Sequence, residues 1–302
     1  MIVNPIMQKD LKTKLRGWRS TILICCYVTL LTGILFLYFA SSNMFNPVSF
    51  QSFNPRMAID AYNILITFQF ALLFIAVPAI TAVSISSERE RQTLDLMLVT
   101  AIPARRIILG KIMVSIAHTM LLLVASLPVI GIVFFFGGIG FADIAKLLLF
   151  YLLTAFFVAS CGVFFSTIFK RNITSIIVTY IFLGLVTFGP FIGYLIFVLL
   201  KQRMIGGGYT PIYRDFVKWL FPSPVFGYIS FYFGSYGGFG IYGGYIFGIS
   251  DIQREIDMLL AAETGLWKYM HPWIVNGLFS IISSVILIFF STLALNPVKR
   301  KH

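Results

Sequence analysis

Histidine side chains are the first place to look for catalytic chemistry in this sequence, which contains three of them: His118, His271 and His302. None belongs to an H-E-x-x-H motif, and no G-x-S-x-G motif occurs. His271 and His302 also lie far from His118 along the chain. A nucleophile and a base that could meet are therefore not indicated, and the pattern argues against a hydrolytic enzyme.

Nucleotide binding is the next chemistry to consider, because G-x-G-x-x-G occurs literally at Gly238, Gly240 and Gly243. A dinucleotide site would need a strand before this motif and a helix after it, and neither is predicted here. The sequence contains no G-x-x-x-x-G-K-[ST] motif. This chain is therefore not expected to bind and hydrolyse ATP itself.

The cysteines Cys25, Cys26 and Cys161 all fall inside apolar runs. A buried cysteine in such a run ordinarily behaves as a small hydrophobic residue. Neither a disulfide framework nor a metal site is predicted.

Composition identifies the class of protein. The 302 residues are 59% hydrophobic and 11% charged, with a mean hydropathy of +0.91, whereas soluble domains carry about 25% charged residues. The net charge of +12 does not indicate a nucleic-acid binder, because the basic residues form short clusters between long apolar runs. The sequence predicts a membrane protein.

Six stretches contain the roughly 20 apolar residues that a helix needs to cross a bilayer. They are residues 21–40, 62–85, 112–136, 144–169, 173–200 and 273–295. We therefore predict an all-α polytopic membrane protein with six transmembrane helices, in which residues 20–302 form the transmembrane domain. The first stretch is too long for a signal-peptide core, so it is expected to be an uncleaved anchor.

The orientation follows from the distribution of Lys and Arg. Most of them lie before the first span, between spans 2 and 3, between spans 4 and 5 and at the C-terminus, whereas the short loops on the other side hold only Arg56 and Lys146. Both termini are therefore predicted to be cytoplasmic, in a cell membrane (plasma or inner).

The segment 201–272 is predicted to be a long extracytoplasmic loop. Residues 216–233 are apolar but contain Lys218, Pro222 and Pro224, and a seventh crossing would move the basic C-terminus to the outside. A re-entrant or interfacial hairpin is the better interpretation.

Residues 1–19 are predicted to form an amphipathic helix at the membrane interface. Asn4 is a suitable N-cap, followed by Pro5 at the first helical position. The apolar face is formed by Met7, Leu11, Leu15 and Trp18. Basic residues on the opposite face suit anionic headgroups, although they are also what the topology alone would require.

The loop 86–111, between spans 2 and 3, combines alternating charges with apolar residues. Its candidate contact residues are Glu88, Arg89, Glu90, Arg91, Thr93, Leu94, Met97 and Leu98. A short helix of this kind suits docking into the groove of a partner. The pattern equally suits an interfacial helix that covers the ends of neighbouring spans, and spacing alone does not choose between them.

At these residues the chain resembles the ABC-2 type permeases, the membrane subunits of ABC exporters. The resemblance rests on Ser87, Glu88, Arg89, Glu90, Thr93, Leu94, Met97 and Leu98, followed by Thr100, Pro103, Arg105, Ile108, Gly110 and Lys111. The N-terminal helix and the six-span layout extend it over nearly the whole chain. One departure is Gln92, where the family commonly has Gly.

The resemblance implies a permease that forms half of a translocation pathway, together with a second permease, identical or closely related. It further implies a separate ATP-binding subunit, which would hold ATP and Mg, and no cofactor bound by this chain. Residues 88–98 would be the coupling helix that contacts this ATPase, and residues 7–18 the connecting helix.

Two other functions are weighed against export. An ion-coupled secondary transporter normally needs acidic residues at membrane depth, but the acidic residues here lie in loops or, like Asp60 and Asp143, at span ends. His118 is the only ionisable residue well inside a predicted span. An intramembrane enzyme is the weaker alternative, for want of a catalytic constellation.

Gly189, Pro190 and Gly193 in span 5 combine a helix breaker with G-x-x-x-G spacing. They predict either a kink beside the pathway or a close helix crossing, and local packing would account for them as well. Aromatic, nearly uncharged spans suit a hydrophobic or amphipathic substrate such as a lipid, a peptide or a drug-like molecule. They do not identify it.

Overall fold

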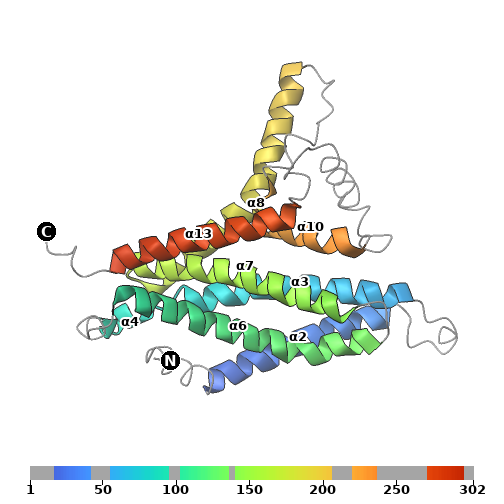
Figure 1. Cartoon of the computed structure of the whole chain (residues 1–302), viewed down its shortest axis with the longest axis horizontal. Helices are drawn as coiled ribbons and strands as arrows, with labels where there is room; N and C mark the ends of the chain where they lie inside the picture. Colours follow the sequence, from blue (N-terminus) through green and yellow to red (C-terminus); the bar gives the residue numbers. More distant parts are fainter. Residues whose placement is uncertain are drawn as a thin grey trace. The chain divides into compact units, whose positions relative to one another are not determined.

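The computed structural model describes residues 17–41, 55–94, 103–135, 140–205, 220–236 and 271–295. Within these ranges every regular element is a helix (Figure 1). The helices are α2 (Trp18–Ser41), α3 (Pro55–Thr81), α4 (Ser86–Glu90), α6 (Ala104–Phe135), α7 (Phe141–Ile168), α8 (Asn172–Ile205), α10 (Pro224–Tyr236) and α13 (Pro272–Leu295).

The six predicted spans are confirmed: six helices of the described residues are long and apolar enough to cross a membrane. The boundaries differ most at spans 2 and 3. The helix of span 2 begins at Pro55 and ends at Thr81, and that of span 3 begins at Ala104, ahead of its apolar run. Trp18, expected to end the interfacial helix, instead begins α2, where it is 79% exposed.

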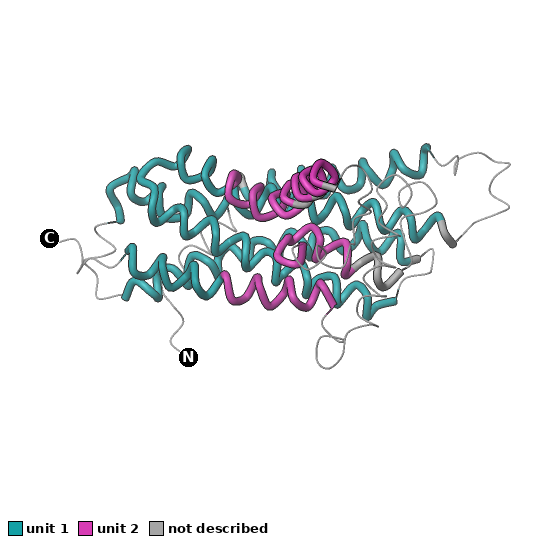
Figure 2. The backbone as a smooth tube through the Cα atoms, turned by 90° about the horizontal axis from the view of Figure 1, so that it is seen from above, with its two compact units in different colours: residues 1–179, 284–302 teal, residues 180–283 magenta. Residues whose placement is uncertain are grey.

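The chain forms two compact units, which Figure 2 distinguishes by colour: Met1–Thr179 with Ser284–His302, and Tyr180–Ser283. In the first unit α2, α3, α6 and α7 lie side by side (Figure 1). The short helix α4 lies at the end of this bundle where α6 begins (Figure 1). This unit therefore positions residues 86–94, the described first part of the loop between spans 2 and 3.

Polar bonds between these helices supplement their apolar packing. The Tyr151 hydroxyl of α7 donates to the Ile66 carbonyl of α3 over 2.7 Å, and Gln69 Nε2 of α3 donates to Ser126 Oγ of α6 over 2.8 Å. Gln69 and Ser126 are fully buried. Interhelical bonds of this kind fix the register of helices whose apolar faces are otherwise interchangeable.

In the second unit, α10 has 13 residues, so it is about 20 Å long and too short for a hydrocarbon core of about 30 Å. It is not among the candidate spans, as expected for the segment 216–233. Before α10, the Ser223 hydroxyl donates to the Thr187 carbonyl of α8 over 2.9 Å. Asn276 of α13 donates to the carbonyls of Phe221 and Pro222 over 3.1 and 3.2 Å. These bonds hold the start of α10 against both neighbouring helices.

Candidate functional site

The α3 helix ends before the loop begins. Pro78 lies in its last turn, where it removes an N–H donor and disturbs the carbonyl four residues earlier. Residues 82–85 form a non-helical turn, in which the Ser84 N–H donates to the Thr81 carbonyl over 3.0 Å. The chain becomes helical again in α4. Span 2 and the loop are therefore joined by a break in the helix rather than by one continuous rod.

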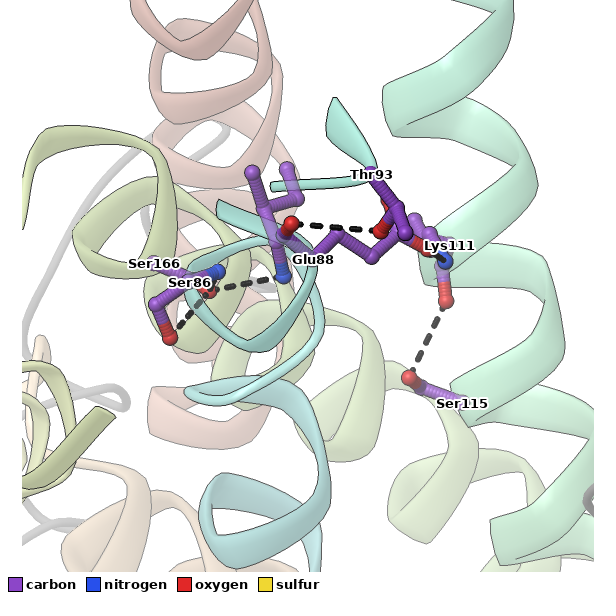
Figure 3. A network of polar contacts seen from close by, with 7 residues as sticks. Ser86, Glu88, Thr93, Lys111, Ser115 and Ser166 are labelled. Carbon is purple, nitrogen blue, oxygen red and sulfur yellow. Dashed lines mark hydrogen bonds and ion pairs between the residues drawn. The ribbon is translucent and has the colours of Figure 1, made fainter. Parts of the chain in front are cut away.

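Serine hydroxyls from α7 and α8 complete the hydrogen bonding of this break. The N–H groups of Ile85 and Ser86 both donate to Ser166 Oγ over 2.9 Å (Figure 3). The Ser175 hydroxyl donates to the Ala82 carbonyl over 2.6 Å. This region is fully buried, as shown by the complete burial of Ser86, Ser166 and Ser175. A backbone N–H or carbonyl left without a partner here would be costly. The break is therefore a stable feature held by two other helices.

Glu88 of α4 forms an ion pair with Lys111 of α6. Lys111 Nζ lies 2.5 Å from Glu88 Oε1, and the two side chains are 4% and 20% exposed, respectively. Figure 3 shows Glu88 and Lys111 extending toward each other across the gap between α4 and α6. The second carboxylate oxygen, Glu88 Oε2, is also shielded from water. Much of the Glu88 charge is thus directed into the protein.

Arg89 binds the C-terminal end of α7. Its Nη2 donates to the Thr167 carbonyl over 2.9 Å and its Nη1 to the Phe169 carbonyl over 3.3 Å. The last carbonyls of a helix lack partners within the helix and carry the negative end of its dipole. The Arg89 guanidinium donates hydrogen bonds to these carbonyls and places a positive charge at the negative end of the dipole.

Glu90 binds the N-terminal end of α8. One carboxylate oxygen accepts the backbone N–H of Asn172 over 2.7 Å, and the other accepts Asn172 Nδ2 over 2.5 Å. Asn172 in turn accepts the Ser86 hydroxyl at its Oδ1 over 2.6 Å. An acidic group is favourable at a helix N-terminus, where N–H groups are unpaired.

After Glu90 the chain turns sharply. Gln92 has a φ of 59°, the left-handed conformation that favours Gly. The Thr93 N–H returns to the Glu88 carbonyl over 2.9 Å and closes the turn. Arg91, Gln92 and Thr93 are exposed, whereas Leu94 is buried. The helix expected over residues 88–98 therefore does not run unbroken: α4 ends at Glu90, and the position where the resembling family commonly has Gly lies in this turn.

The remaining predicted site residues lie outside α4 and the turn that follows it. Met97, Leu98, Met7, Leu11 and Leu15 lie outside the described residues. Gly189, Pro190 and Gly193 all lie within α8, which continues past them. A Cβ added at either glycine would meet nothing within 4 Å, so no close crossing of described helices occurs there.

Lys111, Asn172 and Ser166 belong to this site but were not predicted as part of it. A single cation just before a long apolar run, as at Lys111, was one available signal, because a lone charge near membrane depth usually has a partner. Asn172, an N-cap type of residue after a basic pair, was another. Nothing in the sequence distinguishes Ser166 from the many other serines within spans.

Comparison with known proteins completes the assignment. No curated protein matches the chain. The model of the family described as ABC-2 family transporter protein matches residues 4–239, which include all of the loop between α3 and α6 and the helices that hold it. The chain thus belongs to the ABC-2 family of transporters.

Proposed function

We propose that this chain is the permease subunit of an ATP-driven ABC exporter and forms half of a translocation pathway. Family membership and the six spans support this function. The observation that carries it is the loop after α3, which is built into the end of the helix bundle by hydrogen bonds and an ion pair. A loop that only joined two spans would have no need of such construction.

The energy would come from a separate ATP-binding subunit, which holds the ATP and Mg. We propose that residues 88–98 contact this subunit, together with the connecting helix over residues 1–19. The exposed residues Arg91, Gln92 and Thr93 offer side chains that a partner can reach. The charge distribution along the sequence supports a cytoplasmic position for this loop and for both termini.

The permease is proposed to act as a dimer, with a second copy or a close paralogue completing the pathway about a two-fold axis. Many large apolar side chains of α8 and α13 are exposed in the single chain, which suits contact with lipid or with a second permease. The uncharged character of the spans favours a hydrophobic or amphipathic substrate, such as a lipid, a peptide or a drug-like molecule.

Purification through a tag on this chain tests the proposal. The expected result is co-purification of an ATP-binding subunit and a second permease, with ATP hydrolysis that changes when the permease is present. A purified chain that brings down no ATP-binding subunit from its native membrane would contradict the exporter function.

A further inference from the structure

The three consecutive charged residues Glu88, Arg89 and Glu90 each bind a different helix. Glu88 pairs with Lys111 near the start of α6, Arg89 caps the C-terminal end of α7, and Glu90 caps the first residue of α8. We call these three residues, with Lys111 and Asn172, the α4 clamp. All five residues belong to the first compact unit.

The clamp joins α4 to α6, α7 and α8 through side-chain hydrogen bonds and an ion pair. Residues 82–85 interrupt the helix between α3 and α4, so the backbone there does not act as a rigid lever. The bonds of the clamp are charge-assisted, and such bonds are about twice as strong as neutral ones. The Glu88–Lys111 pair is shielded from water, and removing one partner of a buried ion pair is strongly destabilising.

We infer that Lys111, Arg89 and Asn172 are positioning residues, which make α4 and the turn at residues 169–172 move as one unit when an ATP-binding subunit acts on the loop. This inference rests on the proposed function and specifies its coupling step. Glu88 then acts mainly within the chain. Within the proposed contact segment 88–98, the exposed residues Glu90 to Thr93 are the described ones that an ATPase can reach most easily.

A charge exchange separates this role from direct contact with the ATPase. Glu88→Lys and Lys111→Glu should each lower permease-dependent ATP hydrolysis by about tenfold or more, as for loss of one partner of a buried charge pair. The double variant should recover most of the activity, because the pair is restored with its signs reversed. If Glu88 instead bound the ATPase, the double variant would stay as inactive as Glu88→Lys.

Lys146→Glu provides the matched control. This substitution makes the same change of charge as Lys111→Glu, but near the N-terminal end of α7. The Lys146 side chain is 64% exposed, and its Nζ lies 3.6 Å from Asp143 Oδ1. An exposed pair of this kind contributes little, so its loss should leave hydrolysis unchanged. A defect as large as that of Lys111→Glu would show that charge alone, rather than the clamp, is responsible and would overturn the inference.

A cross-link tests whether α4 and the α7–α8 turn move together. In a chain whose native Cys25, Cys26 and Cys161 are replaced by Ser, Glu90→Cys with Asn172→Cys removes one arm of the clamp. Without a cross-link this variant should couple poorly, and a short bifunctional thiol reagent should restore coupling. The single-cysteine variants, treated identically, should show no recovery.

The outcomes are distinct. If the uncross-linked variant has normal activity and the cross-link abolishes it, α4 and the turn must separate during the cycle, and the inference is wrong. If the unaltered chain recruits no ATP-binding subunit, the proposed function fails and the inference fails with it. Trypsin cleavage after the exposed Arg91 in the isolated permease gives an independent readout: Glu88→Lys should increase it and the double variant should reverse the increase.

Discussion

Gly162 of α7 lies directly against Thr81, the last residue of α3. A Cβ at Gly162 would fall 2.0 Å from Thr81 Oγ1, 2.7 Å from Thr81 Cβ and 3.1 Å from the Ala82 backbone nitrogen. Thr81 is fully buried, and its hydroxyl donates to the Val77 carbonyl over 2.9 Å. The two backbones therefore meet at the point where α3 ends, a few residues before the α4 clamp.

Gly162→Ala should destabilise the chain, because neither the Thr81 backbone nor its bonded side chain can move aside cheaply. Overpacking of this kind costs about 1–3 kcal/mol, measurable as a lower thermal midpoint in detergent. Gly184→Ala in α8 is the control: a Cβ there meets nothing within 4 Å, and Ala favours the helix. Equal melting of the two variants would contradict the close contact.

The turn after α4 predicts an unusual response at Gln92, whose φ is 59°. The left-handed conformation costs a residue with a Cβ roughly 1–2 kcal/mol of conformational free energy, and β-branched residues tolerate it least. Gln92→Gly should therefore be neutral or slightly stabilising, whereas Gln92→Val should destabilise the loop. Trypsin cleavage after Arg91 would report both effects, and faster cleavage of the Gly variant than of the Val variant would argue against the left-handed turn.

Asn276 should be essential for the position of α10. Asn276 is 1% exposed, and its Nδ2 donates to the carbonyls of Phe221 and Pro222. Gly227 packs against the same side chain so closely that a Cβ added at Gly227 would lie 2.6 Å from Asn276 Oδ1. Asn276→Ala leaves the carbonyls without this donor, at a cost of about 1–3 kcal/mol. Asn276→Asp should be worse in a thermal melt, since it places a carboxylate against the same carbonyls. An Asp variant as stable as the unaltered protein would contradict these bonds.

Gln69 and Ser126 should show only modest coupling despite complete burial. Their 2.8 Å bond joins α3 to α6, and double-mutant cycles of interhelical bonds in membranes average about 0.6 kcal/mol. We expect a value of this size from Gln69→Leu, Ser126→Ala and the double variant, measured by unfolding in detergent. Coupling near zero would indicate that the bond is absent.

The membrane orientation is tested by labelling intact cells with an impermeant thiol reagent, after replacement of the native cysteines. A cysteine at Tyr236 should react, because residues 201–272 are predicted to be extracytoplasmic. A cysteine at His302 should react only after the cells are permeabilised. Strong labelling at His302 in intact cells would overturn the predicted topology.

Hydropathy along the chain was enough to predict the membrane class and the number of spans. Transfer into a bilayer depends mainly on the composition of each stretch, so the stretches 112–136 and 273–295 could be recognised without knowledge of their neighbours. Hydropathy did not predict the exact ends of the helices. The helix of span 2 ends at Thr81, before the end of the apolar run predicted over residues 62–85, because Pro78 and the hydroxyls of Ser166 and Ser175 favour a break that hydropathy does not report.

The binding partners of Glu88, Arg89 and Glu90 depend on how the helices pack and could not be predicted from the sequence. The sequence marked Glu88, Arg89, Glu90 and Arg91 as unusual. In the structure Glu88, Arg89 and Glu90 bind α6, α7 and α8, and both Glu90 and Arg91 are exposed. Glu88 and its partner are 23 positions apart, and Glu90 and Asn172 are 82 positions apart. A hydrogen bond or ion pair is a property of two groups within a few ångströms, and only the packing of α4 against α6, α7 and α8 brings these pairs within that distance.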